Sequence, residues 1–253
     1  MGAQVLQAQT PRKQIGDFIE SLSQNDHLRG ASRVMQYYPD GEDFVCVNGK
    51  NRYTRALYGS HSPFRVETSD RPVFAFYNNG LGGNISFNIK TADGSVLPLD
   101  QTAHCEARYT PGKRSYHLTD PSWGKGELFI SVLALPDADG AVWRFSAINM
   151  PPKAKLTWKH GGATKKRLSR NGDLGVDPAD SFELKPEATD IITGELSLKK
   201  EFFFAWGDIP EKGKLPFLYN KAEEARKMLA SRIQIETPDP YLNTLGGALA
   251  VAA

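Results

Sequence analysis

The stretch that decides the fold reads DFVCVNGKNRYTRALYG over residues 43–59 and continues as alternating segments to residue 79. Both residues of the dipeptide Asn48-Gly49 tolerate positive φ, so this dipeptide predicts a tight hairpin between the segments on either side of it. The segments that follow also alternate apolar and polar residues, which is the period of a half-buried strand. We therefore expect three or four consecutive antiparallel strands here, as the start of a large sheet.

The same pattern continues to about residue 206, with turn residues at regular spacing. Expected strands beyond residue 79 lie at 84–90, 96–99, 105–109, 115–118, 128–135, 142–148, 156–158, 182–184, 191–198 and 202–206. Many short strands without helices between them argue against a parallel doubly wound sheet. The predicted fold is mainly β, a large antiparallel β-sandwich of the supersandwich kind.

Both ends of the chain differ from this pattern. From Pro11 an apolar stripe at helical spacing predicts an amphipathic helix. Asn220 and Glu223 fit a capping arrangement that would open a second helix, and Thr237 or Asp239 can cap the segment after it. The predicted organisation is an N-terminal helix and linker over 1–42, a β-sandwich domain over 43–210, a linker helix over 211–238, and the beginning of a truncated helical barrel domain over 239–253. We expect more protein to follow, because 245–253 is an apolar run of small residues with no cap.

Composition excludes several classes of partner. The 253 residues contain 31 Lys and Arg against 29 Asp and Glu, so a net charge of +2 gives no basis for nucleic-acid or membrane binding. No window is long and apolar enough to span a bilayer. The two cysteines, Cys46 and Cys105, are expected to be buried thiols, with a disulfide as the alternative. Histidine spacing indicates no metal site, and no cofactor motif is present.

One predicted strand carries an unusual density of planar cations and aromatic rings. Arg52, Tyr53, Arg55 and Tyr58 follow one another within seven residues. Arginine binds carboxylates bidentately, and tyrosine can act as a base or stack on a sugar ring. The alternative is that these side chains hold domains together. We predict Arg52, Tyr53 and Arg55 as substrate-binding residues.

A glycine-rich segment over 78–84 is predicted to be a hairpin tip or a loop that reaches into a neighbouring pocket. Its Asn78 and Asn79 are the remaining candidates for substrate binding, because amides can bond sugar hydroxyls. No catalytic residue is assigned.

The segments NRYTRALYG (51–59), FRVET (64–68) and RPVF (71–74) resemble the N-terminal domain of a bacterial carbohydrate-active family. It is similar to the polysaccharide lyases that remove rhamnose caps from glucuronate on plant arabinogalactan proteins, the L-rhamnose-α-1,4-D-glucuronate lyases. The resemblance implies a β-sandwich before an (α/α) barrel, β-elimination with a tyrosine base in the barrel, no metal, and a periplasmic or secreted protein that degrades polysaccharide. The predicted partners are a plant glycan or uronic-acid-containing oligosaccharide and the protein's own barrel domain.

Two alternatives remain open. The first is a glycoside hydrolase or phosphorylase of the (α/α)-barrel type. The second is a non-catalytic carbohydrate-binding sandwich that uses a flat aromatic face. The candidates for that face are Trp123, Trp143, Trp158 and Trp206, for which core packing is the other interpretation.

Overall fold

The computed structural model describes residues 37–49, 53–59, 62, 64–78, 81–161 and 191–252. The chain divides into two units, 1–38 and 39–253. Almost all of the first unit, including the helix predicted from Pro11, lies outside the described residues, and so does the strand predicted at 182–184. The fold below is that of the second unit.

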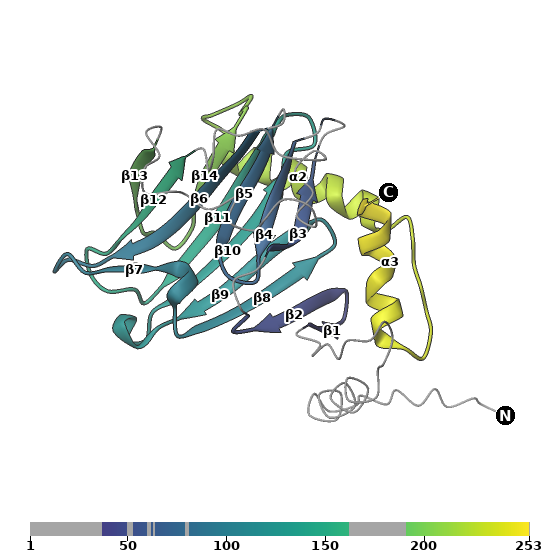
Figure 1. Ribbon diagram of the computed structural model, residues 1–253, viewed down its shortest axis with the longest axis horizontal. Helices are drawn as coiled ribbons and strands as arrows, with labels where there is room; N and C mark the ends of the chain where they lie inside the picture. Colours follow the sequence, from purple (N-terminus) through teal and green to yellow (C-terminus); the bar gives the residue numbers. More distant parts are fainter. Residues whose placement is uncertain are drawn as a thin grey trace. The chain divides into compact units, whose positions relative to one another are not determined.

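Two sheets of antiparallel strands make up most of this unit (Figure 1). The first sheet has the order β1-β2-β8-β9-β10-β11-β14. Its strands are β1 (Tyr38–Asp40), β2 (Asp43–Val47), β8 (His104–Thr110), β9 (Lys113–Thr119), β10 (Glu127–Ala134), β11 (Gly140–Ile148) and β14 (Phe202–Gly207). Here β8 to β11 form an antiparallel meander, as the alternating sequence predicts.

The second sheet has the order β13-β12-β6-β5-β4-β3, with β7 paired to β6. Its strands are β3 (Tyr53–Tyr58), β4 (Arg65–Ser69), β5 (Val73–Asn78), β6 (Leu81–Lys90), β7 (Val96–Pro98), β12 (Lys155–Gly161) and β13 (Ile192–Ser197). The short 3-10 helices are η2 (Leu99–Gln101) and η3 (Pro121–Trp123). The prediction of consecutive antiparallel strands is confirmed for β3 to β6.

Aromatic rings from both sheets meet in the core. Trp143 of the first sheet is fully buried, and its ring lies edge-on to Phe74 of the second sheet at 5.4 Å between centroids. Phe87, also from the second sheet, contacts the rings of Phe145 and Phe204 from the first at 5.3 and 5.4 Å. Edge-to-face contacts at these distances add to the hydrophobic burial. The mainly β, two-layered part of the predicted fold is therefore present.

The predicted hairpin at Asn48-Gly49 is wrong. β2 pairs with β8 in the first sheet, whereas β3 pairs with β4 in the second, so the dipeptide begins the connection from one sheet to the other. Asn48 does adopt a positive φ of 51°. Its backbone N–H donates to the Cys105 carbonyl at 2.8 Å, and its side-chain oxygen accepts from the Cys105 N–H at 2.9 Å. Asn48, with its left-handed backbone, therefore ends the hydrogen-bond ladder between β2 and β8 instead of closing a hairpin turn.

The glycine-rich loop is also shorter than predicted. Asn78 pairs with Leu81, and Gly82 and Gly83 lie within β6 opposite Tyr77 and Phe76. Strand glycines are typical where a bulky neighbour needs room. An added Cβ on Gly83 would lie 3.2 Å from Nε2 of His160, so a larger residue there would press on this ring.

The two cysteines are buried and are not joined by a disulfide, which confirms the expectation of buried thiols. Cys105 lies in β8 with an exposed fraction of 0%. Burial raises the pKa of its thiol to about 12, although the nearby Arg71 and Arg114 act in the opposite direction. The neutral thiol is therefore the stable form, and it behaves as a small core side chain.

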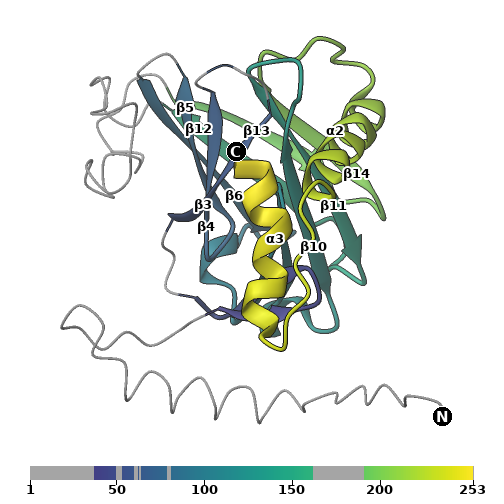
Figure 2. The same ribbon diagram turned by 90° about the vertical axis from the view of Figure 1, so that its right-hand side faces the viewer.

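Two helices of the described residues follow β14, namely α2 (Leu215–Ala230) and α3 (Pro240–Ala252). Figure 2 shows α2 beside β11 and β14. Leu218 and Ala222 of α2 pack on Leu133 and Val142 of the sheet. Neither helix is long and apolar enough to cross a membrane.

The start of α2 differs from the prediction. The helix begins at Leu215 with Pro216 in its first turn, so Asn220 is interior and the predicted capping arrangement is wrong. Proline suits a first turn because its missing N–H has no helical acceptor there. Glu223 instead pairs with Arg226 on the next turn and with Lys113 of β9 at 3.1 Å.

The start of α3 agrees with the prediction. Asp239 accepts a hydrogen bond from the Tyr241 N–H at 2.8 Å, and Thr237 bonds the Asp239 N–H at 3.2 Å. α3 packs on α2, and Thr244 donates to the Gly41 carbonyl at 2.9 Å. Both helices belong to the same compact unit as the sheets. The single helix α3 does not show an (α/α) barrel, which stays a prediction.

Candidate functional site

The residues predicted to bind substrate are only partly described. Arg52 and Asn79 lie outside the described residues. The backbone of Tyr53 begins β3 and that of Asn78 ends β5. The strands that carry Tyr53 and Asn78 are not neighbours in the sheet, because β4 lies between them.

For Arg55, the structure describes both the backbone and the side chain. Its guanidinium lies over the ring of Tyr109 at 5.2 Å and near the ring of Phe44 at 5.9 Å, both from the opposite sheet. Cations at such distances are attracted to the ring faces. Arg55 therefore connects the two sheets, and a contact with substrate stays a prediction.

The tryptophans do not form a flat exposed face. Trp143 and Trp123 are buried, with exposed fractions of 0% and 3%, which confirms core packing for both. Trp158 and Trp206 are half-buried and contact each other at 5.6 Å between ring centroids. Trp206 also packs on His160 at 4.0 Å. Trp143, Trp158 and Trp206 contact aromatic rings across the interface between the sheets.

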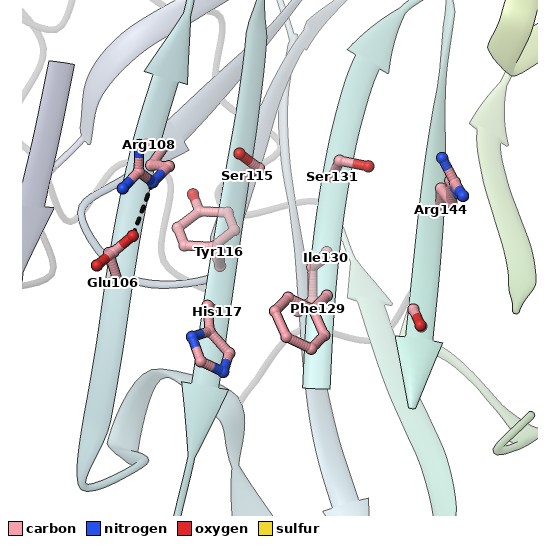
Figure 3. Close-up of a pocket in the computed structure, with 10 residues that line it drawn as sticks. Glu106, Arg108, Ser115, Tyr116, His117, Phe129, Ile130, Ser131 and Arg144 are labelled. Carbon is pink, nitrogen blue, oxygen red and sulfur yellow. Dashed lines mark hydrogen bonds and ion pairs between the residues drawn. The ribbon is translucent and has the colours of Figure 1, made fainter. Parts of the chain in front are cut away.

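A different surface has the properties of a binding site. The outer face of β8 to β11 carries a groove of about 380 Å³ (Figure 3). In one row across the strands, Arg108 lies opposite Ser115, Ser115 opposite Ser131, and Ser131 opposite Arg144. Because serine is small, this row is low in the middle and has a guanidinium at each end. We call this surface, lined by Glu106, Arg108, Ser115, His117, Phe129, Ser131, Arg144 and Ser146, the serine groove.

The neighbouring row supplies an aromatic wall. His117 lies opposite Phe129, and Phe129 lies opposite Ser146. The rings of His117 and Phe129 stack at 4.3 Å with an angle of 4° between their planes. Phe129 remains 36% exposed even though His117 covers one side of its ring. Since Ser146 is too small to cover it, part of this ring faces the groove.

Helix α2 contacts the Arg144 end of the serine groove through Tyr219. The hydroxyls of Tyr219 and Ser131 are hydrogen-bonded at 2.7 Å, and the Arg144 guanidinium lies 5.8 Å from the centre of the Tyr219 ring. Burial raises the pKa of Tyr219, and the bond to Ser131 offsets only part of that rise. The phenol is therefore protonated at neutral pH and able to donate.

Acidic side chains surround Arg108. Its Nε donates to Glu106 at 2.7 Å, and its Nη1 donates to Asp40 and Asp43 at 3.0 and 3.3 Å. Partial burial alone would lower the pKa of this guanidinium, but its three acidic partners outweigh burial and raise the pKa. Arg108 is thus a fixed cation whose charge is already compensated.

The other basic groups of the groove are also paired. Nε and Nη2 of Arg144 lie 2.8 and 2.6 Å from the Glu201 carboxylate. Nε2 of His117 is hydrogen-bonded to the Glu127 carboxyl group at 2.7 Å. The groove therefore presents hydroxyls, an aromatic ring and complete ion pairs.

A family model matches residues 78–223, which is more than half of the chain, and its description is a domain of unknown function, DUF4450. The chain belongs to the DUF4450 family. The matched residues of this DUF4450 chain include β8 to β11 and most of α2, so the whole serine groove lies inside the family's domain. Among curated proteins none matches the chain.

Sequence reasoning missed the serine groove and concentrated on residues 52–79. Across 37–49, 53–59, 62, 64–78, 81–161 and 191–252, no group of three or more His, Cys, Asp or Glu side chains is arranged to hold a metal ion. The signal that was present is alternation, because polar residues occupy every second position of β8 and β9 and, in part, of β10 and β11. That signal predicts an exposed face but does not say which residues meet on it.

Proposed function

We propose that this domain belongs to a carbohydrate-active protein and binds a sugar residue in the serine groove. The observation that carries the proposal is the half-open ring of Phe129, backed by His117 and facing a floor of serine hydroxyls. A pyranose has an apolar face of C–H groups and a rim of hydroxyls. Stacking on an aromatic ring with hydrogen bonds from the sides matches both features.

The size and chemistry of the groove support this proposal. Its volume of about 380 Å³ lies within the range of roughly 300–1,000 Å³ typical of small-ligand sites. Ser115, Ser131 and Ser146 can each donate and accept, as sugar hydroxyls do. The aromatic surface comes from a sheet strand, so its position is fixed by the ladder on both sides.

For the whole protein we propose polysaccharide degradation outside the cytoplasm, by a lyase that cleaves a rhamnose–glucuronate linkage. This wider proposal is supported by the resemblance of segments 51–59, 64–68 and 71–74 to that family. Its test is the absorbance of the unsaturated uronate product when the full-length protein is given arabinogalactan. Release of saturated sugars instead would favour a glycoside hydrolase.

The binding proposal is tested with Phe129→Ala in affinity electrophoresis and calorimetry against a panel of plant and bacterial polysaccharides. Truncating a central aromatic contact should weaken binding about tenfold or more. The matched control is Val96→Ala, which removes an exposed apolar side chain from β7 in the other sheet. Binding that is equal in wild type, Phe129→Ala and Val96→Ala would refute the groove as the sugar site.

A further inference from the structure

The charge pattern of the serine groove bears on which sugar it takes. Arg108 faces three carboxylates, from Glu106, Asp40 and Asp43. A guanidinium that is already surrounded by acids attracts a further carboxylate weakly, because the added anion is repelled by those acids. This end of the groove therefore favours an uncharged ligand.

The Arg144 end of the groove also favours an uncharged ligand, because its basic groups are already paired with acids. Arg144 holds Glu201 through two nitrogens, and His117 holds Glu127. Each basic side chain that lines the groove thus has at least one acidic partner, and the acids outnumber the arginines. A uronate in the groove would have to displace one of these acids or lie among them.

An uncharged sugar meets no such cost. A hydroxyl can accept from a guanidinium N–H and donate to the carboxylate of the same ion pair, so the pair binds it without breaking. Arginine offers five N–H donors, more than the single partner Glu201 can use on Arg144. The hydroxyls of Ser115 and Ser146 extend this set of neutral hydrogen-bonding groups, whereas the hydroxyls of Ser131 and Tyr219 bond each other at 2.7 Å.

We infer that the serine groove selects an uncharged sugar residue and discriminates against uronates. This inference rests on the proposed function, since it presupposes that the groove binds sugar. Binding should also respond little to salt, because no net ion pair forms with the ligand.

The probe is plant arabinogalactan that bears terminal uronates, compared with the same material after reduction of its carboxyl groups to alcohols. Calorimetry should show binding of the reduced form about tenfold tighter than binding of the native form, and Phe129→Ala should weaken both. Glu201→Gln provides the second variant. It leaves Arg144 without its acidic partner, so it should strengthen binding of the native form relative to that of the reduced form.

The outcomes separate the two proposals. If the native form binds more tightly than the reduced form and Phe129→Ala abolishes that binding, the groove is a sugar site but the inference of an uncharged ligand is overturned. If neither form binds, or if Phe129→Ala changes the binding of neither, the proposed function and this inference fall together. Tighter binding of the reduced form, lost in Phe129→Ala, supports both.

Discussion

Replacing Phe87 with alanine should destabilise the domain more than any change on its surface, because this ring joins the two sheets. Phe87 is 1% exposed and belongs to β6 of the second sheet. Its ring lies 5.9 Å from Phe74 in its own sheet, and 6.1, 5.3 and 5.4 Å from Trp143, Phe145 and Phe204 of the first sheet. Truncation would leave a cavity bounded by four aromatic rings that the strands hold in place.

The expected loss of stability in Phe87→Ala follows from the four aromatic rings that surround this side chain. Phe→Ala in a core costs about 3–5 kcal/mol, and the cost is greatest where neighbours cannot collapse into the space. Aromatic pairs add about 0.5–1.5 kcal/mol each beyond burial, so the value for Phe87 belongs in the upper part of that range. Phe87→Leu keeps most of the volume and should cost less than about 1.5 kcal/mol.

Urea unfolding followed by circular dichroism measures these differences as shifts of the midpoint at constant slope. The matched control is Phe217→Ala, because Phe217 of α2 is 54% exposed and its loss should change stability by about 0.5 kcal/mol or less. A loss for Phe87→Ala no larger than that of Phe217→Ala would refute the packing of the sheets through this cluster. Equal losses for Phe87→Ala and Phe87→Leu would refute the contribution of the cavity.

Acid titration, thiol labelling and a glycine substitution each test another part of the fold. Burial would raise the pKa of Glu223, but Arg226 and Lys113 outweigh burial and lower it. The ionised Glu223 therefore stabilises the folded protein above the usual pKa of 4.5, and this stabilisation is lost as pH falls through the lowered value. The gap in urea midpoint between wild type and Glu223→Gln should therefore shrink from neutral pH to about pH 3. Cys105, with a pKa of about 12, should resist alkylation in the native protein and react after unfolding; equal rates would contradict its burial. Gly59→Ala should cost about 1–3 kcal/mol by urea unfolding, because the new Cβ would meet the Leu135 carbonyl, and an unchanged midpoint would contradict that close approach.

Local pattern predicted most of the strands because alternation depends only on neighbouring residues. It could not assign them to sheets, as the connection after β2 illustrates. Asn48 has the positive φ that a hairpin would need, but the partner of β2 is β8, about sixty residues further along the chain. A similar limit applies to α2, where the apparent capping residues Asn220 and Glu223 lie inside a helix that had already begun at Leu215.

The serine groove shows the same limit at the level of function. Phe129 and Ser146 are opposite each other only because β10 and β11 pair in one register, and that register is set by the apolar residues on the other face. A slip of β11 by one residue would turn Ser146 inward and bring Trp143 to the outside, and the resulting loss of core packing disfavours it. The side chains that bury Trp143 therefore also fix the distance between the aromatic ring and the hydroxyls of the groove. A site of this kind is specified by the core beneath it, so it becomes recognisable once the pairing of the strands is known.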